Sequence, residues 1–413
     1  MLKIILKNKQ AMKKFFCRSF LLFNFLSLEV FAEDADQGVL KAMIKEDVNQ
    51  FSTKESSMFS FQPKFSNRFI SDLRFDDNYQ STDRADEYKD TRFKGRLYSK
   101  LNLNKNLAIN GYFRMKEFNK TAADGKDRTF KSEGLYIEEL NMTYSNKKYA
   151  VVAGKFDLNF GTAWRWDRGI WSYETAQNYK EIEKLGFNGI YRLGNSKTVG
   201  EYEFGFGVFT NDRKNLDNSI ITLRDSNSKS DAVPGDTRSL KSYVASLDIN
   251  YDFGEHEKLS YHFSYVDLAV NSSASSVTPT KIDDQKGFAA GMNYEHPVTE
   301  NFAVDWLLEY ASIKNFGGDS DISENYLTAN IIGKVYQNWL VTLGYSNRDN
   351  SEIDAAGFDQ NLSEISFGYE FGKTLFFDKM VLQAGYKNQR TNYKTSLETE
   401  NVFGGLLRLY KNF

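Results

Sequence analysis

The sequence has very little cysteine, proline and histidine, and its mature part has no long apolar run. Its 413 residues include one cysteine, four prolines and three histidines. A single cysteine cannot form an internal disulfide, so covalent cross-links do not stabilise the fold. No stretch beyond the N-terminal segment is apolar for the ~20 residues that a membrane-spanning helix needs. These absences argue against a disulfide-stabilised secreted domain and against a helical membrane protein.

An excess of charge of one sign is also missing. The chain has 53 Lys and Arg residues and 55 Asp and Glu residues, for a formal net charge of -2. Domains that bind nucleic acid are usually strongly basic, so we expect no nucleic-acid partner. No HExxH, GxSxG or phosphate-binding glycine loop occurs in the structural context that its chemistry requires. We therefore expect no enzyme, with no catalytic residues, no metal site and no cofactor.

Aromatic residues are abundant, and they stand in alternating rows. They make up 15 % of the chain, with 34 Phe and 24 Tyr, although the mean hydropathy is only -0.55. From Phe65 onward, about sixteen segments alternate apolar and polar residues, and many have aromatic residues at their ends. Only one face of a transmembrane strand meets lipid, so low mean hydropathy is compatible with this pattern. It predicts an all-β transmembrane antiparallel β-barrel of about 16 strands over residues 59–413.

The connections between these segments alternate in length. Short ones, such as 104–106 and 337–338, alternate with long polar ones at 76–90, 119–133, 211–238, 269–286 and 346–360. Short turns at one rim and long loops at the other are typical of outer-membrane barrels. The four prolines fall outside the predicted strands, as an unbroken hydrogen-bond ladder favours: Pro63, Pro234, Pro279 and Pro297.

The first 32 residues have the pattern of a secretory signal. Basic residues precede an apolar run at 19–28, and Val30 and Ala32 occupy the -3 and -1 positions of a cleavage site. The chain leaves open whether translation starts at Met1 or at Met12. Residues 33–58 are polar with a weak helical pattern, and we expect a periplasmic lead-in, with a short helix as one form of it. The mature chain then has no cysteine, because Cys17 is removed with the signal.

One stretch, 161–184, breaks the alternation. It follows the fifth alternating segment and has three of the chain's five tryptophans. A long loop at this position in a closed barrel can fold inward and narrow the lumen. We expect a pore constriction formed by Trp164, Arg165, Trp166, Asp167, Arg168, Trp171 and Glu174. A long surface loop is the alternative, and the tryptophans either stack on solutes or hold the loop against the wall.

The inward positions of the first three predicted strands are strongly basic. A charge facing lipid costs about 2–4 kcal/mol at the midplane for Arg or Lys, so these side chains should face water. They form a predicted basic wall: Arg68, Arg74, Arg92, Lys94, Arg96, Lys100, Arg114 and Lys116. Later inward positions are more acidic: Glu201, Glu203, Asp248, Asp305, Glu364 and Glu370. The two sets either impose a transverse field or simply keep the lumen hydrated.

Two short motifs resemble those of Gram-negative outer-membrane porins. The run Tyr149 to Asp157, YAVVAGKFD, followed by Phe160-Gly161, resembles the porin stretch before the third loop. The terminal Phe413 on an alternating strand resembles the assembly signal of outer-membrane barrels, although Lys411 departs from the usual apolar residue. The resemblance implies a sixteen-stranded barrel with an inward-folded third loop, often a homotrimer, in the outer membrane. It also implies recognition of the C-terminal strand by the barrel-assembly machinery.

These observations favour an outer-membrane porin. We expect a water-filled channel for passive diffusion of small hydrophilic solutes and ions, with a slight lean to anions from the basic wall. The partners are then outer-membrane lipid and the solutes themselves. Two alternatives remain at this point, namely a channel selective for phosphate, carboxylate or sugar, and a non-transporting barrel that acts through its surface loops as adhesin or receptor.

Overall fold

A computed structural model of the chain describes residues 63–117, 124–165, 168–212, 219, 233–237, 239–254, 257–270, 282–336, 338–352 and 357–413. All of these residues lie in the second of the chain's two units, Asp34–Phe413. The predicted signal (1–32) and lead-in (33–58) lie outside the described residues, so both stay predictions.

The described residues form one β-sheet and a few short 3-10 helices. The sheet has 17 strands, of which β4 has only two residues, leaving sixteen long antiparallel strands. The strands are β1 (Lys64–Ser81), β2 (Lys89–Asn102), β3 (Leu107–Glu117), β4 (Arg128–Thr129), β5 (Glu133–Ser145), β6 (Tyr149–Phe156), β7 (Lys184–Asn195), β8 (Gly200–Asn211), β9 (Ser242–Gly254), β10 (Glu257–Leu268), β11 (Gln285–Thr299), β12 (Phe302–Lys314), β13 (Ile322–Val335), β14 (Trp339–Glu352), β15 (Phe358–Phe371), β16 (Lys379–Tyr393) and β17 (Leu397–Asn412). The 3-10 helices are η1 (Arg84–Asp86), η2 (Thr175–Asn178) and η4 (Phe316–Gly318).

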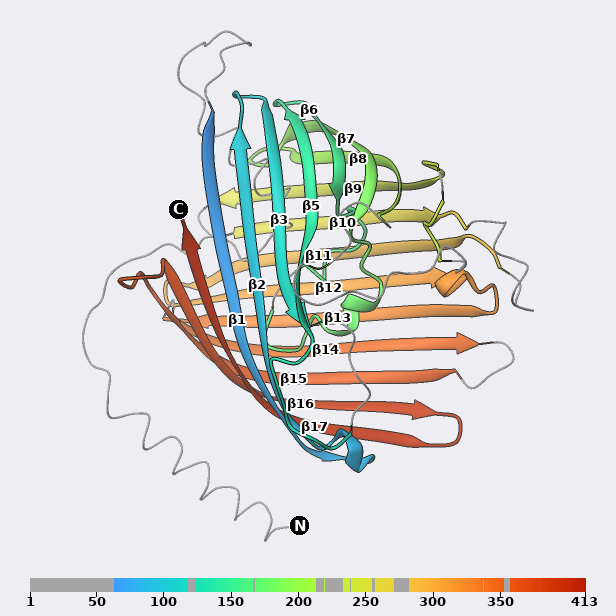
Figure 1. Ribbon diagram of the computed structural model, residues 1–413. Coiled ribbons are helices and arrows are strands. Elements are labelled where there is room, and N and C mark those ends of the chain that lie inside the picture. Colours follow the sequence, from blue (N-terminus) through green and yellow to red (C-terminus); the bar gives the residue numbers. More distant parts are fainter. Residues whose placement is uncertain are drawn as a thin grey trace. The chain divides into compact units, whose positions relative to one another are not determined.

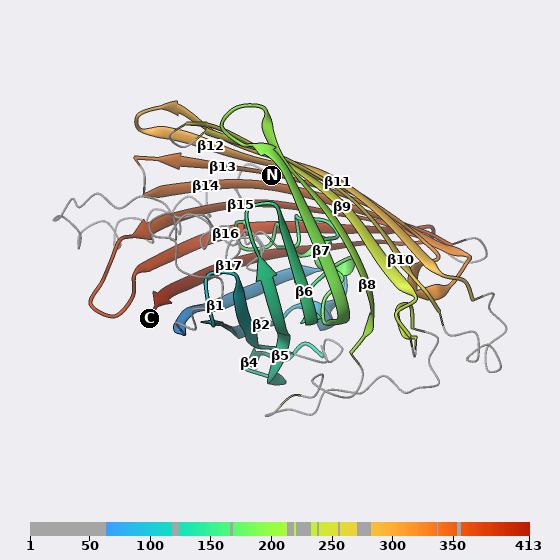
Figure 2. The ribbon, with the colours of Figure 1, turned by 90° about the horizontal axis from the view of Figure 1, so that it is seen from above.

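The sheet closes on itself. Each long strand pairs with its neighbour in the chain, and β1 pairs with both β2 and β17, which joins the two ends of the sheet. In Figures 1 and 2 the blue strand β1 lies beside the red strand β17. Closure satisfies the backbone groups that an open edge would leave unpaired in lipid. The prediction of a closed antiparallel barrel of about 16 strands is therefore confirmed.

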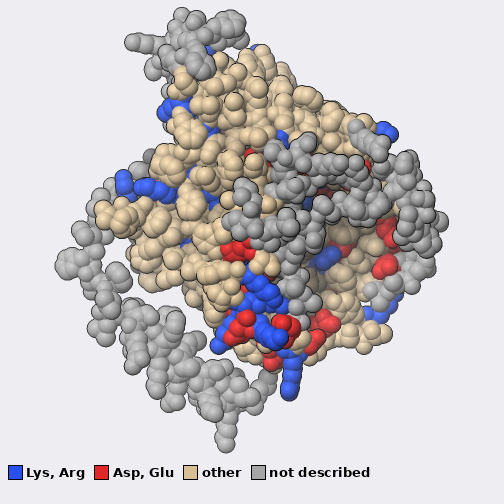
Figure 3. Space-filling model, in the orientation of Figure 1, with Lys and Arg blue, Asp and Glu red and all other residues tan. Residues whose placement is uncertain are grey.

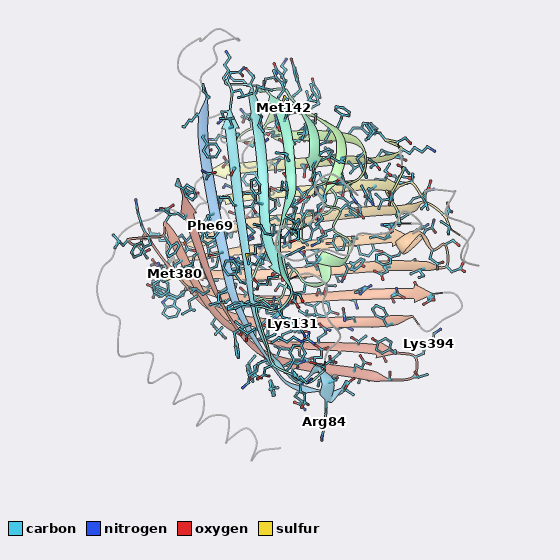
Figure 4. The ribbon with its side chains drawn as sticks, in the orientation of Figure 1. Phe69, Arg84, Lys131, Met142, Met380 and Lys394 are labelled. Carbon is cyan, nitrogen blue, oxygen red and sulfur yellow. The ribbon has the colours of Figure 1, made fainter. Side chains whose placement is uncertain are left out.

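The strands present one apolar face and one polar face. On β1, Phe65, Leu73 and Phe75 are exposed, whereas Asp72 and Arg74 between them are buried. Figure 3 shows a largely uncharged outer surface over β1 to β3, with charged residues gathered near η1. In Figure 4, Met142 and Phe69 lie on strands, whereas the labelled Arg84, Lys131 and Lys394 belong to connections. The alternation fits lipid outside and water inside.

No helix among the described residues is long and apolar enough to cross a membrane.

Three boundaries differ from the sequence-based prediction. The connections expected at 76–90 and 346–360 are mostly strand, because β1 continues to Ser81 and β14 to Glu352. Their polar residues continue the hydrogen-bond ladder past the apolar rows. Pro297 lies inside β11 and not in a turn, so the prediction for this proline was wrong. It stands beside a register shift near the strand end, where a missing N–H group is tolerated.

Candidate functional site

The segment 157–183, between β6 and β7, makes its contacts with polar side chains of many strands. We call it the β6–β7 segment. It follows the fifth long strand, the place that the sequence predicted for the non-alternating stretch. A buried loop must find partners for its own backbone groups, so these contacts decide where it lies.

Glu309 of β12 is the first of two carboxylates that bind the β6–β7 segment. Its Oε2 accepts hydrogen bonds from the backbone N–H and the hydroxyl of Thr162, both at 2.6 Å. Its Oε1 accepts from the backbone N–H of Ala163 at 3.0 Å and from the hydroxyl of Tyr179. Hydrogen bonds to a charged acceptor are stronger than neutral ones. One buried carboxylate therefore binds both the beginning and the end of the segment.

Glu364 of β15 does the same for the middle of the segment. It accepts from the backbone N–H of Ile170 at 2.6 Å, the backbone N–H of Trp171 at 2.9 Å and the hydroxyl of Ser172 at 2.6 Å. Gly169 precedes them with a φ of 61°, and a Cβ there would lie 2.3 Å from the Glu364 carboxylate. Glycine is thus required both by the backbone conformation and by the close approach of the carboxylate.

Trp171 joins the segment to β1. Its side chain is fully buried, and its Nε1–H donates to Asp76 at 3.1 Å. The guanidinium of Arg74 lies 5.5 Å from the centre of the Trp171 ring and donates to the Ile170 carbonyl at 3.2 Å. Arg74 also pairs with Glu174 at 2.6 Å. These contacts favour the interpretation that Trp171 holds the segment against the barrel wall and does not stack on solutes.

The two arginines predicted at the constriction have different partners. Arg168 forms an ion pair with Asp305 of β12 at 2.9 Å. Arg165 instead contacts its own segment, donating to the Leu158 carbonyl and lying 4.7 Å from the centre of the Trp164 ring. Burial lowers the pKa of Arg165, against the opposing effect of nearby carboxylates. Arg168 therefore connects the segment to the wall, and Arg165 braces the segment internally.

A chain of hydrogen bonds fixes the first turn of the segment to β9 and β10. Gly161 N–H donates to Ser264 Oγ at 3.2 Å, Ser264 Oγ lies 2.9 Å from His262 Nε2, and His262 Nδ1 lies 2.8 Å from Asp248. The second Asp248 oxygen accepts from the Asn159 side-chain amide at 2.8 Å. With a neutral imidazole, each donor in this chain has one acceptor. Serine hydrolases have hydrogen-bonded side chains in the same order, Asp–His–Ser. Here the Asp and the Ser at the two ends of this row are both hydrogen-bonded to the β6–β7 segment.

The predicted basic wall is largely paired with carboxylates that the sequence-based prediction did not include. Arg92 contacts Asp76, which also pairs with the neighbouring arginine of β1 at 2.8 Å. Asp72 lies between two buried arginines, Arg96 at 3.0 Å and Arg408 at 2.7 Å. Asp72 and Asp76 have the inward parity of β1, so alternation alone could have found them. The wall is therefore a network of both signs.

Arg114 has a partner that strict alternation hides. Its NH1 lies 2.6 Å from both oxygens of Glu138. By parity Glu138 belongs with the exposed Leu140, which faces outward. The pairing of β3 with β5 shifts register between Tyr112 and Phe113, and this bulge turns Glu138 inward. A bulge cannot be located from periodicity, so no pattern in the sequence indicates this ion pair.

The remaining members of the basic wall lie near rings or are buried. Lys100 is buried on β2. The cationic groups of the other three lie 5.3 to 5.9 Å from ring centres, Arg68 over Tyr410, Lys94 over Tyr173 and Lys116 over Tyr136.

Both ends of the segment contribute charged groups. Burial lowers the pKa of Lys180 to about 8, and the positive charge of Arg114 acts in the same direction. Burial raises the pKa of Asp157 well above its usual range, as do Glu138 and Glu139 nearby. Within the described ranges, no group of three or more His, Cys, Asp or Glu side chains is arranged to hold a metal ion.

Comparison with solved structures finds several outer-membrane proteins. The outer membrane channel DcaP of Acinetobacter baumannii aligns over 86 % of this chain and 99 % of its own, with 12 % identity and a TM-score of 0.50. An anion-selective porin from Comamonas acidovorans covers 85 % of this chain and 100 % of its own, with 12 % identity and a TM-score of 0.45. OccAB2 of Acinetobacter baumannii covers 84 % and 98 %, with 9 % identity and a TM-score of 0.46. No family model and no curated protein matches the sequence.

The fold is that of an outer-membrane porin. This agrees with the outer-membrane location expected from the sequence, because closure and an apolar outer face suit a transmembrane barrel. At this level of identity the likeness concerns the fold alone.

Within this porin barrel, the predicted site residues divide into three groups. Trp164, Arg168 and Trp171 are buried between segment and strands, and Arg165 and Glu174 are half-buried. Trp166 and Asp167 lie outside the described residues. The eight residues of the basic wall lie on β1, β2 and β3, on the face opposite the apolar rows. Phe413 follows β17, and its backbone exchanges hydrogen bonds with Asn67 at 2.7 and 3.0 Å.

Proposed function

We propose that the protein is an outer-membrane porin whose lumen is narrowed by the β6–β7 segment. In this proposal, small hydrophilic solutes and ions cross the barrel by passive diffusion. The observation that carries this proposal is the set of contacts between one segment and inward side chains of β1, β9, β12 and β15. Those strands stand far apart around the sheet, so a segment that reaches all of them has to cross the interior.

The electrostatics support a lumen in which charges of both signs face water. The pairing of Arg74, Arg92, Arg96 and Arg114 with carboxylates reduces the net charge of the basic wall. Charged groups across a narrow passage orient and select solutes even when their total is small.

A homotrimer and assembly through the C-terminal strand belong to the same proposal. The pairing of β1 with β17 continues through the backbone hydrogen bonds of Phe413, whose side chain is exposed. Cross-linking of intact outer membranes and native mass measurement would test the trimer.

Single-channel recording in a planar bilayer under a salt gradient tests the central proposal. Discrete conductance steps support a channel, and the reversal potential reports its ion preference. A folded, heat-modifiable barrel that gives no steps would overturn the proposal and move the function to the outer loops, as adhesin or receptor.

A further inference from the structure

Two aromatic rings of the β6–β7 segment lie directly on glycines of the barrel wall. A Cβ added to Gly287 of β11 would lie 2.6 Å from the ring of Phe160, and one added to Gly404 of β17 would lie 2.5 Å from the ring of Trp171. Carbon atoms in contact are normally about 3.5–4.0 Å apart. Any larger residue at either glycine would therefore have to move the ring by about 1 Å.

Both glycines belong to the inward face of the sheet. Gly287 has the parity of Ala289, which is fully buried, and Gly404 has the parity of Val402 and Leu406, which are buried on either side of it. A side chain at these positions would enter the interior and not the lipid. The missing side chains therefore make room for the segment.

Gly344 of β14 receives a third side chain of the segment. A Cβ at this position would lie 2.1 Å from the Oγ of Ser172 and 3.0 Å from its Cβ. The neighbouring inward residues of β14, Thr342 and Ser346, are fully buried. The Ser346 hydroxyl lies 2.6 Å from the hydroxyl of Thr175. The middle of the segment thus lies on a row of small residues of β14.

The two aromatic rings cannot turn aside freely. Phe160 is fully buried, and its ring meets the ring of Tyr179 edge-on, with the centres 6.3 Å apart. Its carbonyl accepts a hydrogen bond from Trp164 Nε1 at 2.8 Å. The ring of Trp171 is fixed by its hydrogen bond to Asp76 at 3.1 Å. A group that grows from the wall would therefore push the segment itself, because the strands are held by their hydrogen-bond ladder.

We propose that Gly287, Gly344 and Gly404 set how close the segment lies to the wall, and thereby the width of the passage beside it. The inference rests on the proposed channel function and adds positioning residues that lie on strands, outside the segment. These glycines act through the segment and need not touch a solute. Only a residue without a side chain permits so close an approach.

The first test replaces Gly344 with alanine. The added methyl group should push Ser172 toward the lumen, so single-channel conductance should fall and smaller polyethylene glycols should be excluded from the pore. Gly333→Ala of β13 is the matched control. Its Cβ would lie 3.4 Å from the nearest atom, in the ring of Phe302, and its neighbours within 4 Å belong to strands. This variant should keep the wild-type conductance and polymer cut-off.

A second change in the segment should reverse the effect. Gly344→Ala/Ser172→Gly removes both the Oγ and the Cβ that the new methyl group meets, so conductance and cut-off should return toward those of Ser172→Gly alone. The single variant is the reference because Ser172 also donates to Glu364. Damage to the strand would not be repaired by a smaller residue in the segment.

Gly287→Ala tests the beginning of the segment in the same way. It should also lower conductance, and Phe160→Leu, which shortens the opposing side chain, should restore it. The new methyl group would lie 2.9 Å from Val266 of the wall as well, so Gly344→Ala decides if this variant does not fold. Gly404 is left unchanged, because a Cβ there would lie 2.8 Å from the Phe75 carbonyl and disturb the pairing of β1 with β17.

The outcomes separate this inference from the proposed function. Folded Gly344→Ala channels with unchanged or raised conductance would overturn the positioning role and leave the channel intact. A lowered conductance that Ser172→Gly does not restore would overturn it as well. Absence of conductance in a heat-modifiable wild-type barrel would instead overturn the channel itself.

Discussion

Glu309 and Thr162 are joined by two hydrogen bonds of 2.6 Å, although 147 residues separate them in the chain. One comes from the backbone of the β6–β7 segment and the other from its side chain, and both end on the same oxygen. Glu309 and Glu364 thus bind the β6–β7 segment to the barrel through their carboxylates. Removing these two charges should therefore release the segment.

Replacing Glu309 and Glu364 together with glutamine should loosen the β6–β7 segment. Each change removes the charge and puts an amide donor opposite N–H donors, at a cost of about 1–3 kcal/mol for each anchor. If the segment narrows the lumen, single-channel conductance and current noise should both increase. Glu370→Gln is the control, because Glu370 pairs with Lys379 on a strand and not with the segment. Unchanged conductance in the double variant would show that the segment does not limit the current.

Changing Arg92, Arg96 and Arg114 to serine should shift the reversal potential toward cation preference. The change removes three positive charges and leaves their carboxylate partners without a counter-charge. Loss of one partner of a buried ion pair costs about 3–5 kcal/mol, so heat-modifiability must be checked first.

A charge-neutral variant separates field effects from damage to the barrel. Arg114→Ser/Glu138→Ser removes a pair whose atoms are 2.6 Å apart and leaves the net charge of the lumen unchanged. Its reversal potential should stay close to that of the wild type, whereas Arg114→Ser alone should move toward cations. Equal shifts in both variants would contradict the electrostatic explanation.

Raising the pH from 7 to 9 should reduce anion preference through Lys180. Its amine has a pKa of about 8, so it is mostly charged at the lower pH and mostly neutral at the higher one. Its folded-state pKa lies below the ordinary lysine value of about 10.4, so burial of the charged form disfavours folding. This penalty is present in full below about pH 8 and decreases as the pH rises from about 8 to about 10.4. Lys180→Met should remove the step in a titration of reversal potential. A step that persists in this variant would assign the titration to another group.

Replacing Trp171 with alanine should detach the middle of the segment. The ring is fully buried, and its loss costs about 3–5 kcal/mol in a packed site. Trp171→Phe retains most of the apolar area but loses the hydrogen bond to Asp76. We expect raised conductance noise for the alanine variant and a smaller effect for phenylalanine. The Trp171 ring is fully buried and offers no surface on which a sugar can stack. Sugar solutes should therefore not reduce the wild-type current by binding to Trp171.

Removal of the signal can be measured directly. Intact-mass analysis of protein from the outer-membrane fraction should show a chain that begins at Glu33, after cleavage behind Ala32. It should also show no reaction with a thiol reagent, since Cys17 is the only cysteine. A chain that still reacts would place the cleavage site elsewhere.

The sequence by itself determined the barrel, because a period of two and the exclusion of charge from lipid are local properties of each strand. It also placed Glu364 on the polar face, but it could not single out this residue or Glu309 as an anchor, since a carboxylate that binds a loop and one that faces water have the same parity. Tertiary structure alone decided that Glu138 turns inward beside Arg114 through a bulge, and that Trp171 lies against Arg74 and Asp76. Both depend on register and on contacts between residues far apart in the chain, which no local pattern encodes.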